Sequence, residues 1–173
     1  LHNFCAVDLS AFYLDIRKDV LYCDVPSSLR RRAARTVLDT LNDCLVKWLA
    51  PFICFTAEEA WLARHPNEAG SVHLEQFPTI PDEWRDAVLA EKWEKVRDLR
   101  RVVTGALELA RTAKKIGASL QADPKVYAPA EMAALARSLP MDDICITSSI
   151  SVTEGAAPPG AYTLPDVPGV GVV

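Results

Sequence analysis

The sequence lacks the residue spacings on which most metal sites and nucleophilic catalytic centres depend. Its five cysteines include no Cys-x-x-Cys pair, and its three histidines complete no ligand set with metal spacing. No G-x-x-x-x-G-K-S/T loop, H-E-x-x-H pair or G-x-S-x-G elbow occurs. We therefore predict that the chain has no metal-binding residues and no catalytic residues of its own.

The sequence also lacks the segments that direct a protein to or across a membrane. It has no signal peptide and no apolar run of about 18 residues, the length that spans a bilayer. We expect no membrane association and a cytoplasmic protein. Because the cysteines have apolar neighbours, we expect reduced, buried and unreactive thiols; they are Cys5, Cys23, Cys44, Cys54 and Cys145. The chain begins with Leu1 inside an amphipathic pattern, so we expect it to be cut from a longer protein.

Charge is distributed unevenly along the 173 residues, half of which are hydrophobic. The formal net charge of -4 is unfavourable for nucleic-acid binding, yet two segments are basic. Residues 27–48 hold five cationic side chains against two acidic ones, and residues 95–115 hold seven against two. The composition predicts a globular protein with a real core. The asymmetry predicts basic surface patches that the net charge hides.

A proline turn between two helices is the centre of the predicted fold. Pro51 ends the helix that arrives through Trp48, because proline lacks an amide hydrogen and restricts the residue before it. Thr56 and Glu59 have the spacing of a capping box, which predicts a new helix start at Thr56. The apolar run 52–55 between them predicts a turn that is buried inside a larger helical body.

Helical periodicity covers most of the first 122 residues. We predict helices at 1–18, at 28–49 and from about 82 to 116, with Gly117 as the last helix's C-cap. A short strand at 125–128, a helix at 130–139 and one or two strands within 142–153 predict a small α/β appendage. The proline- and glycine-rich residues 154–173 have no period. The predicted domains are therefore 1–122, 123–153 and a linker or disordered tail at 154–173.

Two groups of charged residues invite a functional interpretation. Asp8 and Asp15 lie on one side of the first helix, where paired carboxylates can serve acid-base chemistry but more often are solvated or paired with arginine. The long helix carries a basic stripe within an arc of about 100° at 3.6 residues per turn; it comprises Arg97, Arg100, Arg101, Arg111 and Lys115.

Several stretches resemble one family. The string from Asp8 to Tyr22, the Leu-Ala-Pro turn, and Phe-Thr-Ala-Glu-Glu-Ala-Trp ending at Trp61 are similar to the anticodon-binding helical domain of bacterial isoleucyl-tRNA synthetases. Val-His-Leu at 72–74 and Lys-Ile-Gly-Ala-Ser-Leu-Gln-Ala at 115–122 also resemble the family, with Gln121 where glutamate is usual. The likeness covers residues 1–123 well.

The resemblance implies a mainly α fold, an anticodon-binding helix bundle that is partial at its N-terminus, followed by the α/β appendage. It implies a tRNA-recognition fragment of an enzyme that charges tRNA(Ile) with isoleucine, using ATP and Mg²⁺. The implied partners are tRNA(Ile) and the catalytic and editing domains of the same parent chain. The His-Ile-Gly-His and Lys-Met-Ser-Lys-Ser type motifs are missing, so the fragment itself is expected to be non-catalytic. The zinc module that often follows in the family is also missing here.

Ten basic residues near the end of the long helix and the start of the second are candidates for tRNA contact: Arg17, Lys18, Arg30, Arg31, Arg97, Arg100, Arg101, Arg111, Lys114 and Lys115. Two alternatives remain, a free-standing helical RNA-binding module and a helical protein-interaction scaffold whose basic stripe is only solvated. We also expect self-association through an apolar stripe of the first helix, comprising Phe4, Val7, Ala11 and Leu14.

Overall fold

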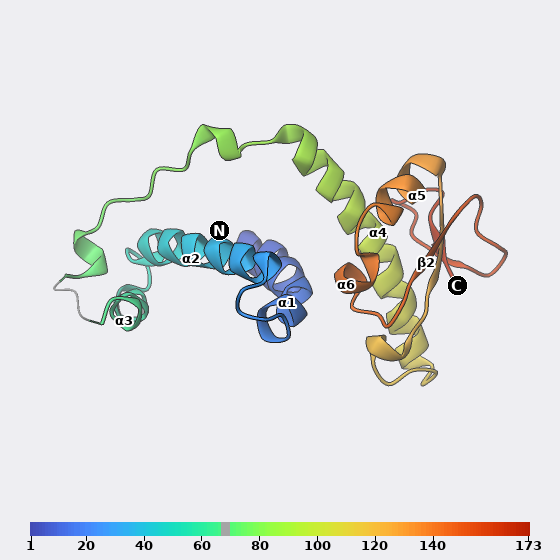
Figure 1. The fold of residues 1–173 in the computed structure, drawn as a ribbon, viewed down its shortest axis with the longest axis horizontal. Coiled ribbons are helices and arrows are strands. Elements are labelled where there is room, and N and C mark those ends of the chain that lie inside the picture. Colours follow the sequence, from blue (N-terminus) through green and yellow to red (C-terminus); the bar gives the residue numbers. More distant parts are fainter. Residues whose placement is uncertain (67–69) are drawn as a thin grey trace. The chain divides into compact units, whose positions relative to one another are not determined.

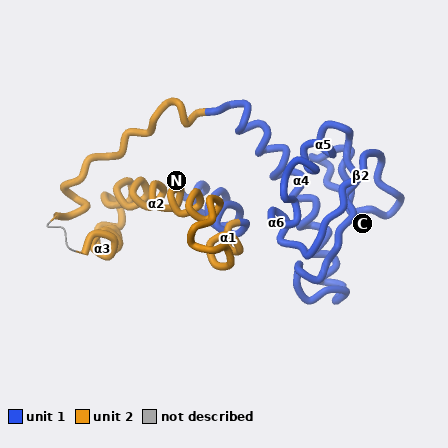
Figure 2. Tube along the Cα trace, viewed as in Figure 1, with its two compact units in different colours: residues 1–16, 86–173 blue, residues 17–85 orange. Residues whose placement is uncertain are grey.

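A computed structural model describes residues 1–66 and 70–173. The chain forms two compact units, which Figure 2 shows in different colours. Unit 1 comprises residues 1–16 and 86–173, and unit 2 comprises residues 17–85. The fold is mainly helical with one small sheet, as the sequence predicts. No helix in the described ranges is long and apolar enough to cross a membrane.

Unit 1 is built on a long helix and a sheet. The helix α4, Ala87–Thr112, lies against α5, Ala130–Arg137, and α6, Met141–Cys145 (Figure 1). The strands are β1, Lys125–Ala128, β2, Ser151–Glu154, β3, Tyr162–Thr163, and β4, Gly171–Val172. The sheet order is β2-β1-β4-β3, with β1 and β2 parallel and the other pairs antiparallel. Helices α5 and α6 therefore form the crossover between the two parallel strands.

The core of unit 1 lies between α4 and the sheet. Leu99, Val102 and Val103 of α4 are fully buried beside Val126 of β1 and Val170. Within α4, Gly105 permits a close approach by β3, because a Cβ there would meet the Tyr162 ring at 2.5 to 2.7 Å. The glycine that weakens the helix locally is thus explained by sheet packing.

The prediction of a linker or disordered tail at 154–173 is wrong for this segment. Strand β4 pairs with both β1 and β3, and Val167, Val170 and Val172 are buried in the core of unit 1. The prolines and glycines supply tight turns between short strands, which hides any period. Of the one or two strands predicted within 142–153, one is present as β2, whereas residues 141–145 form α6 after Pro140 and not a strand. The predicted boundary at 122 falls inside unit 1.

Unit 1 also contains the first helix, which has π geometry over Phe4–Leu14. Leu9 and Ile16 are buried, whereas Val7 and Leu14 are exposed. Within the predicted apolar stripe of this helix, Val7, Ala11 and Leu14 are therefore exposed, whereas Phe4 is partly buried. A 3₁₀ turn at Ser119–Gln121 completes the unit's helical elements.

Unit 2 contains α1, Lys18–Tyr22, α2, Leu29–Leu49, and α3, Cys54–Arg64. Two 3₁₀ turns follow at Val72–Leu74 and Asp82–Trp84. The helix predicted at 28–49 is confirmed, and Ser28 caps it by accepting from the Arg31 amide. The core of unit 2 comprises Val46, Ala50, Ala57, Trp61 and Val72.

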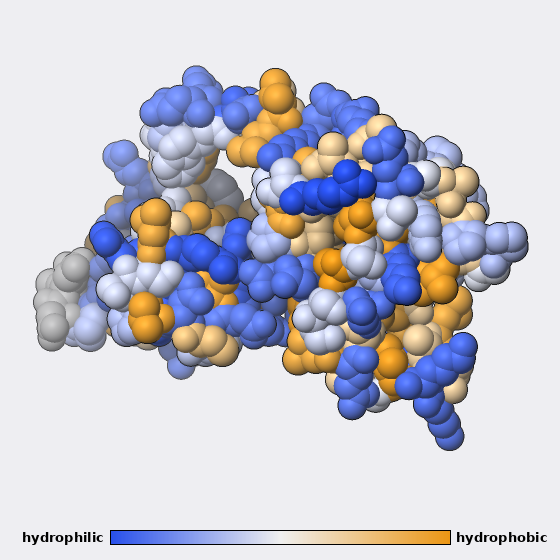
Figure 3. All heavy atoms as spheres, turned by 45° about the vertical axis from the view of Figure 1, so that its right-hand side comes forward, coloured by the Kyte–Doolittle hydropathy of each residue, from blue (hydrophilic) through white to orange (hydrophobic). Residues whose placement is uncertain are grey.

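The proline turn differs from its prediction. Helix α3 begins at Cys54, so Thr56 lies inside the helix and makes no capping box. Phe52 and Phe55 are 81% and 93% exposed, and Ile53 is also exposed, so the turn is not buried. Apolar side chains reach the surface at several places on the visible face (Figure 3). Glu58 instead ties α3 to the 3₁₀ turn, accepting from the Ser71 hydroxyl at 2.8 Å and the Val72 amide at 2.9 Å.

Candidate nucleic-acid interface

The ten predicted basic residues divide between the two units. Arg97, Arg100, Arg101 and Arg111 lie on α4, with Lys114 and Lys115 directly after it, all in unit 1. Arg17 precedes α1, Lys18 begins it, and Arg30 and Arg31 lie in the first turn of α2, all in unit 2. The structure thus gathers six candidates on one helix and its end.

Arg97 and Arg100 hold the first helix against α4. The Arg97 guanidinium binds Asp8 at 2.6 Å and lies 5.0 Å from the Phe12 ring centre. Arg100 binds Asp15 at 2.8 Å and donates to the carbonyls of Ala11 and Ile144. The Arg100 side chain is only 16% exposed. Of the interpretations of Asp8 and Asp15, pairing with arginine is confirmed, and both guanidinium groups already serve the protein's own packing.

Arg101 is engaged at the surface of unit 1. It binds Asp98 at 3.0 Å and Asp166 at 2.7 Å, which ties α4 to the segment before β4. The hydrogen bond from Arg101 lowers the pKa of the Asp166 carboxyl, and the same bond raises the pKa of Arg101. Lys95 similarly binds Glu131 of α5 at 2.6 Å, and that hydrogen bond lowers the pKa of Glu131.

The C-terminal end of α4 presents two adjacent exposed cations, Lys114 and Lys115. Lys114 has a positive φ of 56°, and the amides of Lys114 and Lys115 bond to the carbonyls of Arg111 and Ala110. This is the Schellman pattern with lysine in the position that glycine usually takes. The prediction that Gly117 caps the helix is therefore wrong. Lys114 and Lys115 are exposed, and within the described part of the chain no ion pair holds either one.

Two side chains organise the rest of this helix end. Arg111 pairs with Glu108 at 2.7 Å, and both are about half exposed. The side-chain oxygen of Gln121 accepts from the amides of Gly117 at 2.7 Å and Ala118 at 3.3 Å. A carboxylate could accept the same two amides, so glutamate would also fit at this position. The loop that follows the two lysines is thereby held in place.

The basic candidates of unit 2 are partly committed to local structure. The guanidinium of Arg31 donates to the Asp24 carbonyl at 2.6 Å, which fixes the turn between α1 and α2. Arg17, Lys18 and Arg30 each take part in interactions within the chain. These four residues flank one turn, so they can act together only on the surface around the start of α2.

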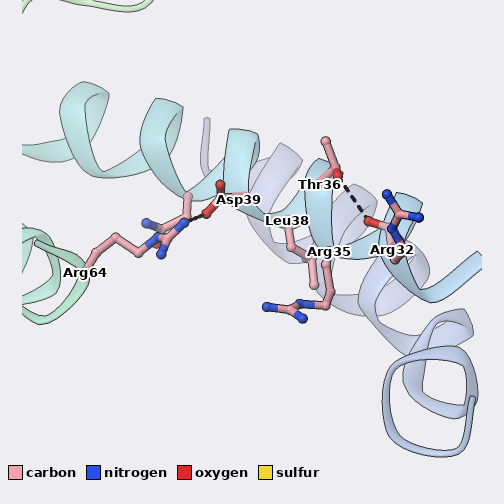
Figure 4. Close-up of a pocket in the computed structure, with 7 residues that line it drawn as sticks. Arg32, Arg35, Thr36, Leu38, Asp39 and Arg64 are labelled. Carbon is pink, nitrogen blue, oxygen red and sulfur yellow. Dashed lines mark hydrogen bonds and ion pairs between the residues drawn. The ribbon is translucent and has the colours of Figure 1, made fainter. Parts of the chain in front are cut away.

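The structure adds a polar groove that the list of candidates omitted. A groove of about 500 Å³ lies between α2 and α3, and Figure 4 shows Arg64 of α3 reaching Asp39 of α2 across it. Arg32 and Arg35 of α2 line the same groove. The sequence carries a signal for it, since Arg32, Arg35, Asp39 and Asn42 recur at helical spacing. Of this arginine-rich segment, the candidates predicted from the sequence include only Arg30 and Arg31.

No group of three or more His, Cys, Asp or Glu side chains that could hold a metal ion occurs in the described ranges.

Two cysteines contradict their prediction: Cys23 and Cys54 are exposed, while Cys44 and Cys145 are buried as expected. Burial raises the pKa of the Cys145 thiol to about 12. That thiol is therefore protonated at neutral pH and is a poor nucleophile.

The sequence is similar to that of one protein family over most of its length. The family model described as the anticodon-binding domain of tRNA ligase matches residues 1–126. Isoleucine--tRNA ligases from Mesorhizobium japonicum and Brucella abortus are each 58% identical over the whole chain, and that of Bartonella henselae is 53% identical over 99% of it. The chain spans 17 to 18% of the length of these relatives. The chain belongs to the anticodon-binding domain family of tRNA ligases.

Proposed function

We propose that this chain is the part of an isoleucine-tRNA ligase that recognises tRNA(Ile), and that it has no catalytic step of its own. The observation that carries the proposal is the identity of more than half the residues with isoleucine--tRNA ligases along the chain. In the proposed parent enzyme, ATP and Mg²⁺ act in other domains, and the catalytic and editing domains are covalent partners. The proposed location is the cytoplasm, and any zinc module lies outside this chain.

The ten basic candidates have different physical grounds for contact with tRNA. Lys114 and Lys115 are exposed cations at a helix end, which suits phosphate binding. Arg111 can join them by giving up an exposed pair with Glu108 that contributes at most about 1 kcal/mol. Arg97, Arg100 and Arg101 act mainly by holding this surface together, because each guanidinium is already paired with one or two carboxylates. Arg17, Lys18, Arg30 and Arg31 form a second proposed contact area.

The exposed apolar residues of the first helix suit a protein partner. Val7 and Leu14 are 51% and 39% exposed, and Ala11 is exposed beside them. A partner that covers these exposed apolar side chains removes them from water, which favours association. We place the remaining domains of the ligase there, or a second copy of the chain when those domains are missing.

A salt titration of tRNA(Ile) binding tests the proposal. If three to five phosphates are neutralised, log K should fall with log salt at a slope of about -2 to -4. Changing Arg111, Lys114 and Lys115 together to alanine should weaken binding and make the slope shallower by about 2. The matched control is Lys92→Ala, which removes an exposed cation from the other end of α4.

Two results would count against the proposal, and a third would relocate its tRNA contact. Absence of salt-sensitive tRNA binding would favour a protein-interaction scaffold. Unchanged affinity and slope in the triple variant would move the contact to Arg17, Lys18, Arg30 and Arg31. Pyrophosphate exchange above background with isoleucine and ATP would show a catalytic site in this chain, contrary to its missing motifs.

A further inference from the structure

The groove between α2 and α3 is built from one helix face and one opposing side chain. Arg32, Arg35, Asp39 and Asn42 are spaced by three, four and three residues, so they form one polar ridge along α2. Arg64, in the last turn of α3, faces this ridge and binds Asp39 (Figure 4). Every member of this set belongs to unit 2.

The charges in this groove favour an anion. Three guanidinium groups and one carboxylate line it, leaving an excess of positive charge. Arg32 and Arg35 are exposed, and the structure describes no carboxylate bound to either one within residues 1–66 and 70–173. Guanidinium groups bind phosphate with two parallel hydrogen bonds, which makes arginine well suited to this ligand.

The pair between Arg64 and Asp39 is exchangeable. Their side chains are 54% and 55% exposed, so water competes for both ends and the pair contributes about 0 to 1 kcal/mol. A phosphate that enters the groove can therefore take Arg64 from Asp39 at small cost. Asp39 in turn opposes the anion, because it places a negative charge in the same groove.

The other end of the groove has a different chemistry. A smaller hollow of about 150 Å³ shares Asp39, Asn42 and Arg64 with the groove and extends to Trp61 and His65. The rings of Trp61 and His65 are stacked at 4.0 Å with an angle of 27°. Asn42 offers an amide donor and an acceptor there, and Asp43 adds a second carboxylate. This end disfavours phosphate and suits a neutral polar group such as a ribose or a base.

We propose that the groove binds a strand of RNA, with successive phosphates on Arg32 and Arg35 and a sugar or base beside Asn42. Arg32 and Arg35 are three residues apart, about 4.5 Å along the helix axis, and their long side chains can spread to reach neighbouring phosphates of one strand. Each arginine can thus take its own phosphate, and Arg64 can join either one. This inference rests on the proposed function and adds a contact site on unit 2 outside the ten candidate residues.

Two variants with opposite expected effects test the groove by tRNA binding. Arg32→Ala with Arg35→Ala should weaken binding about tenfold and make the salt slope shallower by about 1.5, because two phosphate contacts are lost. Asp39→Asn should tighten binding several-fold, because it removes a repulsive charge and frees Arg64. A gain of affinity cannot arise from misfolding. The controls are Arg85→Ala and Asp82→Asn, which change exposed charges of the same unit outside the groove and should shift affinity less than twofold.

A second measurement separates this site from the function on which it rests. The side-chain N–H signals of Arg32, Arg35 and Arg64 are followed by NMR while a short single-stranded RNA or inorganic phosphate is added to the unmodified chain. Larger shifts with RNA than with phosphate support the strand site, even if tRNA(Ile) fails to bind and the proposed function falls. Equal shifts with both would reduce it to a simple anion site. Normal tRNA binding with unmoved arginine signals, or with an unaffected Arg32/Arg35 double variant, would overturn the groove and leave the proposed function standing.

Discussion

The arginines on one face of α4 differ in burial and therefore in role. The Arg100 side chain is largely buried and joins α4 to the first helix, through Asp15 and Ala11, and to α6, through Ile144. Arg101, its neighbour in sequence, lies at the surface and pairs with Asp166. Both belong to the basic stripe that the periodicity of α4 predicts. Burial and partners distinguish them, and neither can be deduced from helical spacing alone.

Removing these two arginines should therefore have unequal effects on stability. Arg100→Ala should lower the free energy of unfolding by about 2 kcal/mol, because it leaves a half-buried carboxylate and a carbonyl without their charged donor. Arg101→Ala should cost less than about 1 kcal/mol, because its pairs are exposed. Urea unfolding followed by circular dichroism measures both. Equal small losses would show that Arg100 does not hold the first helix in place.

The cysteines should differ in reactivity according to their burial. Cys23 and Cys54 are exposed and should be alkylated first in the folded chain at neutral pH. Cys145 should be protected, since burial raises the pKa of its thiol to about 12. Burial and the nearby Asp43 also raise the pKa of Cys44, so it should react slowly. Mass spectrometry after brief alkylation gives the order, with urea-unfolded protein as the control. Labelling of Cys145 as fast as Cys54 would contradict this account.

At the scale of elements, sequence patterns located most helices and failed at their ends. The strand 125–128 and the helices at 28–49 and 130–139 follow from periodicity and a serine cap. The start of α3 and the end of α4 do not, because Thr56 and Gly117 had the better local signals. Strand β4 was missed for a different reason: two residues between turns carry no period, and its pairing with β1 is a long-range contact.

The end of α4 provides a test of its geometry. Lys114 has a left-handed backbone, which costs a side-chain-bearing residue about 1 kcal/mol relative to glycine. Lys114→Gly should therefore be more stable than Lys114→Ala by about that amount, although both remove the same charge. Thermal unfolding of the two variants compares them directly. Identical melting temperatures would mean that the helix does not end in a left-handed residue at this position.

At the scale of the molecule, the sequence was sufficient to predict the family and the fold class. It was not sufficient to predict which charged side chains pair with each other and which line a groove. Motifs such as the Asp8–Tyr22 string are contiguous in the sequence, so the family could be recognised without knowledge of the fold. The groove lined by Arg32, Arg35 and Arg64 needs α3 to lie against α2, which no local pattern encodes. Likewise, Asp8 and Asp166, which pair with Arg97 and Arg101, are distant from them in sequence, so these two pairs become visible only in the fold.

We propose that this chain recognises the anticodon of an isoleucine tRNA, and a comparison of two tRNAs tests this proposal most directly. The measurement is the affinity for tRNA(Ile) and for the same tRNA with its anticodon exchanged, at one fixed salt concentration. We predict a loss of about tenfold or more on exchange, because bases confer specificity while phosphates only position. The double variant Lys114→Ala and Lys115→Ala should lower the affinity for both tRNAs by the same factor. Equal affinity of the unmodified chain for the two tRNAs would contradict anticodon recognition and leave only charge-driven RNA binding.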